Sequence, residues 1–385
     1  MVKQISKYTV VLNLIFILFI NSTFSQEYHE WEDLSVFSIN TEEAHATLNL
    51  FQNEIQALKL NKEQSSLYQS LNGTWDFYLA KNASEVPNGF HKEEYDRSNW
   101  ETIPVPSNWQ FHTDDFPLYT NIIYLYEINP PYMPQDYNPI GCYWRTFSVN
   151  ENLLNKQLFM HFGAGNSAFY IWVNGVKVGY SEGSKTPAEF DVSPYLKEGK
   201  NNVALEVIRW SDGTYLEDQD FWRLSGNERD VYLYAQPRVA LRDFFVKGNL
   251  DADYIDGELS VEIQLKNYSK LDAKGKIQIA LYDENEQLVL EKPAFEVSAE
   301  DETIVSFSEK IEQPKLWSAE KPNLYTLTIS VLDEVGKETQ AVKQDVGFRS
   351  VELGGGQLLV NGQPILFKGV NRHEHDETTG YVVSK

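Results

Sequence analysis

Short runs of alternating apolar and polar residues, separated by turn residues, fill most of the chain from Leu71 onward. Strict alternation is typical of β-strands that bury one face. Within residues 71–237 the runs are LNGTWDFYLA, WETIPVP, CYWRTFSV, KQLFMHFG, SAFYIWV, VKVGYSE, NNVALEVIRW and DVYLYAQP. Asn174 and Gly175 lie between two of these runs and indicate a hairpin turn. The pattern predicts a β-sandwich of jelly-roll size over residues 71–237.

A second group of alternating runs occupies residues 238–347. Its members are GELSVEIQLKN, GKIQIALYDE, TIVSFSEKI and LYTLTISVLDE, and no cysteine pair accompanies them. This spacing predicts an immunoglobulin-like sandwich without a disulfide. After residue 348 the pattern changes to a short hairpin and one apolar strand, ILFKGV, which runs into a polar cluster.

The N-terminal part of the chain contains little strand pattern. Lys3 and Lys7 precede an uncharged run over residues 8–20, which is short for a membrane span and is followed by small polar residues. We therefore expect residues 1–25 to be a signal peptide, the protein to be periplasmic or secreted without a membrane anchor, and the mature protein to begin near Gln26, which its intact mass would test. Residues 26–70 form an N-terminal arm, in which the spacing over residues 41–58 predicts an amphipathic helix.

Composition supports a mostly β protein, since 14% of the 385 residues are aromatic. The only cysteine is Cys142, so no intramolecular disulfide can form, and we expect this side chain to be a small buried apolar group. The formal net charge is −23. Nucleic acid and anionic membranes are poor partners for such a surface. Solubility alone could explain the charge, and a neutral substrate such as a sugar is compatible with it.

Residues 209–222, RWSDGTYLEDQDFW, place four carboxylates and several aromatic side chains directly after an apolar strand pattern. Taken alone, Asp212 before Gly213 is typical of a turn. We expect Glu217, Asp218 and Asp220 to be structural, bonding backbone amides and either Arg223 or Arg229.

Six segments carry a resemblance to a known family. They are VPSNWQ (105–110), PLYTN (117–121), RWSDGTYLEDQDFWRLSG (209–226), PKLWSAEKPNLY (314–325), DVGFRSVEL (345–353) and GVNRHEH (369–375). In order and spacing they resemble bacterial β-galactosidases of glycoside hydrolase family 2, over nearly all of the chain from Trp31 onward. The resemblance implies a jelly-roll sugar-binding domain (71–237), an immunoglobulin-like sandwich (238–347) and the first strand of a truncated (β/α)8 barrel (348–385).

The resemblance also implies three substrate-binding residues. Asp212 would contact a galactosyl hydroxyl and a sodium ion, which suits a hard anionic oxygen. Asn108 would offer an amide to a sugar hydroxyl, although a turn or cap role is the alternative. His373, at the end of the first barrel strand, would bond sugar hydroxyls. His373 and His375 also suggest a metal site, but two histidines are too few for structural zinc.

The sequence departs from the family pattern in two places. Asn227 and Glu228 stand where relatives carry apolar residues, which we expect to weaken the packing of that loop. The segment after His375 reads DETTG, without the proline that many relatives have there.

The catalytic groups are expected outside this chain. Retaining glycosidases use two carboxylates about 5 Å apart. In similar enzymes both glutamates, and the magnesium ligands, lie on later barrel strands, so they are expected beyond Lys385. The implied function is hydrolysis of terminal β-galactosyl residues with retention, for which the 385-residue chain alone would be inactive.

Other interpretations remain open at this point. One is a different family 2 activity, such as β-glucuronidase or β-mannosidase, and another is a non-catalytic carbohydrate-binding protein. The expected partners are β-galactoside oligosaccharides, together with either further copies of the chain in a homo-oligomer or a complementing C-terminal polypeptide.

Overall fold

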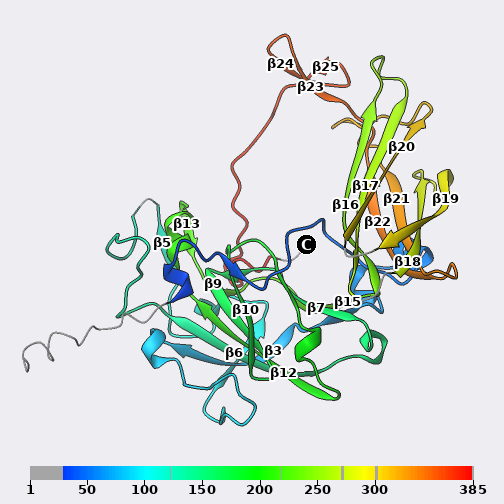
Figure 1. Ribbon diagram of the computed structural model, residues 1–385. Helices are drawn as coiled ribbons and strands as arrows, with labels where there is room; N and C mark the ends of the chain where they lie inside the picture. The colour runs from blue at the N-terminus through cyan, green and yellow to red at the C-terminus, as the bar shows by residue number, and fades with distance from the viewer. Residues whose placement is uncertain (1–28, 122, 218, 270–272, 300–301, 384–385) are drawn as a thin grey trace, which may run out of the picture.

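A computed structural model describes residues 29–121, 123–217, 219–269, 273–299 and 302–383. The predicted signal peptide and Asp218 lie outside these ranges. The described chain forms two β-sandwiches, followed by a C-terminal segment that returns from the second sandwich to the first (Figure 1). The mostly β expectation is therefore confirmed.

The first sandwich is a jelly roll built from two antiparallel sheets. A seven-stranded sheet has the order β1 (Ser38–Ile39), β10 (Val176–Glu182), β9 (Ala168–Val173), β12 (Lys200–Ile208), β6 (Ile140–Ser148), β3 (Gly73–Ala80) and β4 (Glu101–Val105). A four-stranded sheet has the order β11 (Ala188–Asp191), β7 (Gln157–Phe162), β15 (Val231–Gln236) and β2 (Tyr68–Ser70). Large apolar side chains from both sheets, such as Trp75, Leu205 and Phe162, form one core between them.

Local sequence signals explain parts of this sandwich. The predicted hairpin at Asn174 and Gly175 is confirmed, because both residues have positive φ (51° and 81°) and connect β9 to β10. Such a pair of left-handed residues matches the right-handed twist of a hairpin. Cys142 is buried, as expected. Two small ribbons extend the sandwich at one end, and they are β5 (Leu118–Thr120) with β13 (Phe221–Arg223) and β8 (Gly165–Asn166) with β14 (Gly226–Asn227).

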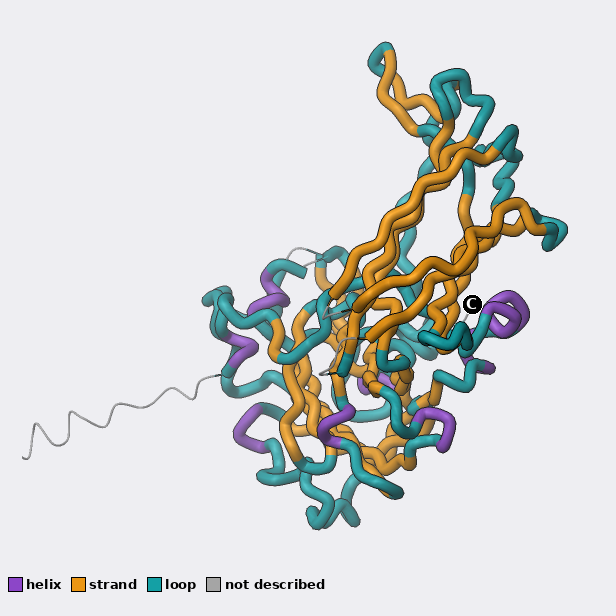
Figure 2. Tube along the Cα trace, turned by 45° about the vertical axis from the view of Figure 1, so that its right-hand side comes forward, coloured by secondary structure: helices purple, strands orange, loops and turns teal. Residues whose placement is uncertain are grey.

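The second sandwich is also built from two antiparallel sheets. One contains β16 (Val239–Leu250), β17 (Gly257–Asn267) and β20 (Glu302–Ile311). The other has the order β19 (Leu288–Ala299), β18 (Ala273–Tyr282), β21 (Tyr325–Leu332) and β22 (Glu338–Val346). Alternate residues of β17, Leu259, Val261 and Ile263, are buried against the facing sheet, as the period of two requires. Figure 2 shows these long strands extending away from the jelly roll.

The N-terminal arm corrects one prediction. We expected a helix over residues 41–58, but the only helix in this range is α2 (Glu54–Lys59), which begins near its end. Asn53 caps α2, because its side chain accepts a hydrogen bond from Gln56 N. Upstream the backbone is held by the sandwiches instead, because Ala46 N donates to Asp243 and Phe51 pairs with Ala341. Long-range bonds therefore override the helical spacing.

The single-turn 3-10 helices are η1 (Glu30–Glu32), η2 (Lys62–Gln64), η3 (Ala83–Glu85), η4 (Trp109–Phe111), η5 (Glu151–Leu153), η6 (Ser193–Tyr195) and η7 (Asp212–Tyr215).

A partly buried carboxylate connects the arm to the jelly roll. Glu189 accepts hydrogen bonds from His45 Nε2 (2.8 Å), His161 Nδ1 (2.6 Å) and the Tyr234 hydroxyl (2.5 Å). Burial alone would raise the pKa of Glu189, but the bonds from His161 and His45 lower it well below its ordinary value of 4.5. Burial alone would lower the pKa of His45, but Glu189 raises it above 6.5.

The shifted pKa values of Glu189 and His45 predict that the contact between the arm and the jelly roll depends on pH. The lowered pKa of Glu189 stabilises the fold above pH 4.5, and this stabilisation is lost as the pH falls through the pKa of Glu189 in the folded protein. The raised pKa of His45 stabilises the fold below pH 6.5, and this stabilisation is lost as the pH rises through the pKa of His45 in the folded protein. Both charges are thus present between these limits.

We expect Glu189→Gln to lower the free energy of unfolding by about 2–3 kcal/mol near pH 5.5, and by clearly less near pH 8.5. Denaturant unfolding at both pH values measures this, with exposed Glu43→Gln as control, and equal losses would contradict it.

The C-terminal segment contacts both sandwiches. A small sheet of β23 (Val351–Gly354), β24 (Gln357–Val360) and β25 (Gln363–Pro364) rests on the second sandwich, where Asn361 Nδ2 donates to Trp317 O (3.0 Å). The following residues are exposed, and the chain then reaches the jelly roll again near Tyr381 (Figure 1). The apolar strand predicted at residues 365–370 is not formed, because after β25 these residues have no strand partner and are exposed.

Candidate functional site

The candidate site lies where the loop after β12, the ribbon strand β13 and the C-terminal segment meet. A cavity of about 1120 Å³ opens between them. Its lining carries cationic side chains (Lys185, Arg209, Arg223, Arg229 and Arg372) and acidic ones (Glu217, Glu228, Asp230 and Glu374). Of the three predicted substrate residues, His373 lines this cavity, whereas Asn108 and Asp212 are buried beside it with 1% and 4% exposure.

Asp115 holds two of the sequence motifs together. Its carboxylate accepts from Trp109 Nε1 (2.7 Å) and Gln110 Nε2 (3.0 Å) of the 105–110 motif. It also accepts from Tyr137 (2.7 Å) and from Arg209 Nη1 (2.5 Å), the first residue of the 209–226 motif. Burial, and then the bond to Asp115, raises the pKa of Tyr137 to about 12, so its hydroxyl remains a donor. Sequence reasoning did not single out Asp115, since nothing near it in the chain indicates these partners.

Asn108 is held by three bonds. Its Nδ2 donates to Glu228 Oε1 (3.0 Å) and to Ser225 O (3.4 Å), and its Oδ1 accepts from Tyr381 N (2.9 Å). The amide orientation is therefore fixed, with both amide hydrogens directed into the protein. Gly380 allows the close approach, because a Cβ at this position would lie 2.5 Å from Asn108 Oδ1. Asn108 thus connects the jelly roll to the C-terminal segment.

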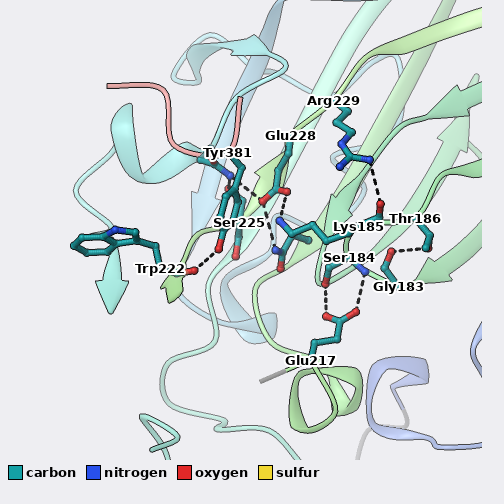
Figure 3. A network of polar contacts seen from close by, with 12 residues as sticks. Gly183, Ser184, Lys185, Thr186, Glu217, Trp222, Ser225, Glu228, Arg229 and Tyr381 are labelled. Carbon is teal, nitrogen blue, oxygen red and sulfur yellow. Dashed lines mark hydrogen bonds and ion pairs between the residues drawn. The ribbon is translucent and has the colours of Figure 1, made fainter. Parts of the chain in front are cut away.

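Glu228, noted as a departure from the family pattern, is the centre of this network. It is buried, forms an ion pair with Lys185 and accepts from Asn166 Nδ2 (3.4 Å) as well as from Asn108. Figure 3 shows Lys185 and Glu228 directed toward each other, with Tyr381 beside them. The Lys185 ammonium lies 3.6 Å from the centroid of the Tyr381 ring, and Tyr381 donates its hydroxyl to Trp222 O. Polar contacts pack Glu228 at this position, whereas the side-chain amide atoms of Asn227 are buried without a hydrogen-bond partner among the described residues, so the expectation of weaker packing stays a prediction.

Asp212 lies at the start of η7, beside a second carboxylate, Glu182, at the end of β10. Burial raises the pKa of both groups, and the charge of Asp212 raises that of Glu182 further. Glu32 and Asp33 of the arm act on Asp212 in the same direction. The Asp212 Oδ2 atom is buried and has no hydrogen-bond partner among the described residues. The motif alone did not indicate Glu182, since it is 30 positions earlier in the chain.

His373 takes an exposed position at the cavity. Its ring stacks on Phe221 of β13 with a centroid distance of 4.6 Å and an interplanar angle of 25°. His375 packs edge-on against the same ring at 5.4 Å. The two histidines therefore share one aromatic neighbour, Phe221.

Two acids of the 209–222 loop, Glu217 and Asp220, have hydrogen-bond partners among the described residues. Glu217 accepts from Ser184 N (3.0 Å) and from the Ser184 hydroxyl (Figure 3). Asp220 accepts from the Tyr119 hydroxyl. The backbone-amide role is thus confirmed for Glu217, while neither acid forms an ion pair with Arg223 or Arg229 in the structure. Asp218 lies outside the described residues.

Two kinds of feature are absent from the described part of the chain. It contains no group of three or more His, Cys, Asp or Glu side chains arranged to hold a metal ion. It also contains no helix with the length and apolar character needed to cross a membrane.

Comparison with protein families gives three consecutive matches. Residues 68–237 match the sugar binding domain of glycosyl hydrolases family 2, residues 239–349 match the next domain of glycosyl hydrolases family 2, and residues 351–385 match the TIM barrel domain of that family. The matches follow the order of the two sandwiches and the C-terminal segment.

Curated relatives are similar over nearly the whole chain. A beta-galactosidase of Priestia megaterium is 44% identical over 360 residues, which are 92% of this chain and 35% of the relative. A beta-galactosidase of Vibrio cholerae is 41% identical over 92% of this chain and 35% of the relative. The chain spans about a third of the length of these relatives.

Solved structures share the fold at lower identity. Beta-glucuronidase 2 of Bacteroides uniformis, covalently bound to cyclophellitol-6-carboxylate aziridine, has a TM-score of 0.69 and 22% identity over 82% of this chain and 37% of that one. A beta-glucuronidase from an uncultured Clostridium has a TM-score of 0.60 and 24% identity over 82% of this chain and 50% of that one. At such identities the likeness concerns the fold alone.

Proposed function

This chain belongs to glycosyl hydrolase family 2, and from that membership we propose that it forms the N-terminal portion of a β-galactosidase. The reaction would be hydrolysis of terminal, non-reducing β-D-galactosyl residues with retention. The observation that carries this proposal is the 44% identity to a beta-galactosidase across 92% of the chain, including the 209–226 motif at the cavity. Its substrates would be β-galactoside oligosaccharides.

The family also implies a sodium ion at Asp212, and one feature of the structure fits it. Asp212 Oδ2 is buried without a hydrogen-bond partner among the described residues, so an ionised carboxylate oxygen is available there. Carboxylate oxygens are good ligands for hard cations. Asp212 would hold the ion, and the ion would supply a positive charge that orients a sugar hydroxyl. No residue of this chain is assigned to magnesium.

The proposed sugar contacts differ in accessibility. The exposed ring of His373, fixed by stacking on Phe221, can hydrogen-bond a hydroxyl directly. Asn108 uses both amide hydrogens within the protein, so it could offer a sugar only its Oδ1 atom, after Tyr381 N moves away. We therefore assign the donor contacts to His373 and an acceptor contact to Asn108.

Residues of this chain would bind and orient the sugar, and we propose that the catalytic pair belongs to later strands of the barrel. Retention requires an acid/base carboxylate and a nucleophilic carboxylate about 5 Å apart. The matched barrel segment covers only residues 351–385, and we expect both carboxylates beyond Lys385.

Turnover of chromogenic glycosides tests the proposal. Residues 26–385 would be joined to the remaining part of the Priestia megaterium relative, and the 385-residue chain and that remaining part would serve as separate controls. We expect the joined protein to hydrolyse a β-galactoside in preference to a β-glucuronide or β-mannoside. We expect the chain alone to show no turnover, because the acid/base and nucleophilic carboxylates are expected on later barrel strands. Turnover by the chain alone, or preference for the glucuronide, would contradict it.

A further inference from the structure

Glu228 is a buried carboxylate that receives donors from three different segments of the jelly roll. Its Oε1 atom accepts from Asn108 Nδ2 (3.0 Å) and from Asn166 Nδ2 (3.4 Å), and its Oε2 atom forms an ion pair with Lys185 Nζ. Only 3% of Glu228 is exposed. An ionised carboxylate only accepts hydrogen bonds, so all three neighbours must direct N–H groups toward it.

Lys185 favours the ionised form of Glu228. Burial raises the pKa of Glu228 above its ordinary value of 4.5, and the Lys185 ammonium opposes that shift. The ammonium also lies over the ring of Tyr381, 3.6 Å from the ring centroid. A buried carboxylate without such a cation is driven to take up a proton, which would give it a donor hydrogen.

The two ends of the Asn108 amide have different surroundings. The nitrogen end faces two acceptors, Glu228 Oε1 and Ser225 O, and the oxygen end accepts from Tyr381 N (2.9 Å). A flipped amide would place its oxygen against the Glu228 carboxylate and its nitrogen against Tyr381 N. The bond to Glu228 dominates this preference, because hydrogen bonds to ionised groups are about twice as strong as neutral ones. An apolar residue at position 228 would supply no acceptor.

We propose that Glu228 is a positioning residue, which fixes the Asn108 amide so that only its oxygen can face a sugar. Asn108 would contact the sugar, and Glu228 would act through Asn108 without touching the substrate. An asparagine amide that is free to rotate offers either a donor or an acceptor. With the amide fixed, Asn108 recognises only a substituent that carries a hydrogen to donate. The inference rests on the proposed function, through the sugar contact assigned to Asn108, and it adds the residue that determines the direction of that contact.

Fluorinated galactosides test which end of the Asn108 amide faces the sugar. In each of these aryl β-galactosides one sugar hydroxyl is replaced by fluorine, which carries no hydrogen to donate, and the hydroxyl next to the reacting carbon is left unchanged. The quantity measured in the joined enzyme is the factor by which kcat/KM falls when fluorine replaces the hydroxyl. Because the same pair of substrates is compared in every variant, the effect of fluorine on the reactivity of the sugar cancels.

We expect Glu228→Leu to reduce this factor by about 5- to 20-fold at one hydroxyl position, because the freed amide can turn its nitrogen toward the fluorine and two acceptors no longer face each other. At the other positions the factor should stay as in the wild type. Glu228→Asp keeps the carboxylate and should restore part of the discrimination. Glu217→Gln is the matched control, since Glu217 lines the same cavity but bonds Ser184, and it should leave every factor unchanged.

Hydrogen exchange at the Asn108 amide tests the positioning without any activity measurement. In the 385-residue chain with isotope-labelled asparagine, the side-chain signal of Asn108 is identified by its loss in Asn108→Asp. We expect the Nδ2 hydrogens to exchange with solvent about tenfold faster, or more, in Glu228→Leu than in the wild type. If the single variant folds poorly, Glu228→Leu combined with Lys185→Met gives the same test, because it leaves no unpaired charge from this ion pair.

Two results would overturn the inference. Unchanged fluorine factors in an active Glu228→Leu enzyme would show that Glu228 does not determine the sugar contact, and unchanged exchange would show that the Asn108 amide is held without Glu228. Failure of the wild-type joined enzyme to hydrolyse any galactoside would instead refute the proposed function. In that case the exchange measurement alone decides whether Glu228 fixes the amide.

Discussion

Replacing Asp115 with alanine is expected to lower the free energy of unfolding by about 3–5 kcal/mol, the usual loss when one partner of a buried ion pair is removed. Arg209 and Asp115 are both almost completely buried, so the guanidinium would keep its charge without its partner. Trp109, Gln110 and Tyr137 would each lose a hydrogen bond as well. Because these residues belong to two different motifs, the loops around the cavity should separate.

Denaturant unfolding followed by tryptophan fluorescence measures this effect, since Trp109 is one of the donors. Asp114→Ala is a matched control, because the neighbouring carboxylate is exposed. Asp115→Asn should show a smaller loss, since an amide keeps an acceptor oxygen but not the charge. A loss for Asp115→Ala no larger than that of the control would mean that the Arg209 pair does not stabilise the fold.

The second large effect concerns catalysis in the joined enzyme. We expect Asp212→Ala to reduce kcat/KM for a β-galactoside by about 30- to 1000-fold, which corresponds to the loss of one charge-assisted contact of about 2–4 kcal/mol in a site with little water. Activation by sodium should weaken in parallel, because a cation ligand is removed. Thermal stability should change little or rise, since Asp212 faces Glu182 without a neutralising side chain.

The decisive measurement compares kcat/KM with and without sodium for the wild type and Asp212→Ala, together with thermal unfolding of both. Asp220→Asn controls for general effects of removing a charge from this loop. Wild-type kinetics in Asp212→Ala, or inactivity explained by unfolding alone, would show that the acid is structural. The assignment of the sugar site to this loop would then be wrong.

The sequence by itself determined the features that depend on neighbouring residues. Period-two alternation located the strands of both sandwiches, and the Asn174 and Gly175 pair located a hairpin, because side-chain direction and turn conformation are local properties. The motifs led to the family, which three consecutive domain matches support. The helix expected over residues 41–58 failed where long-range bonds of the arm to both sandwiches replaced the local preference.

Only the tertiary structure decided which polar groups meet. Asp115 contacts Arg209 94 positions away, and Glu228 contacts Asn108 120 positions away. Glu228 stood out in the sequence as a polar residue at an apolar position, yet its partners Lys185 and Asn166 did not. Glu182 carried no signal, because burial beside Asp212 arises only when β10 and the loop after β12 are brought together. A buried charge is stable only where partners from the surrounding structure neutralise or hydrogen-bond it. Those partners come from segments distant in the sequence, so no local sequence pattern reveals them.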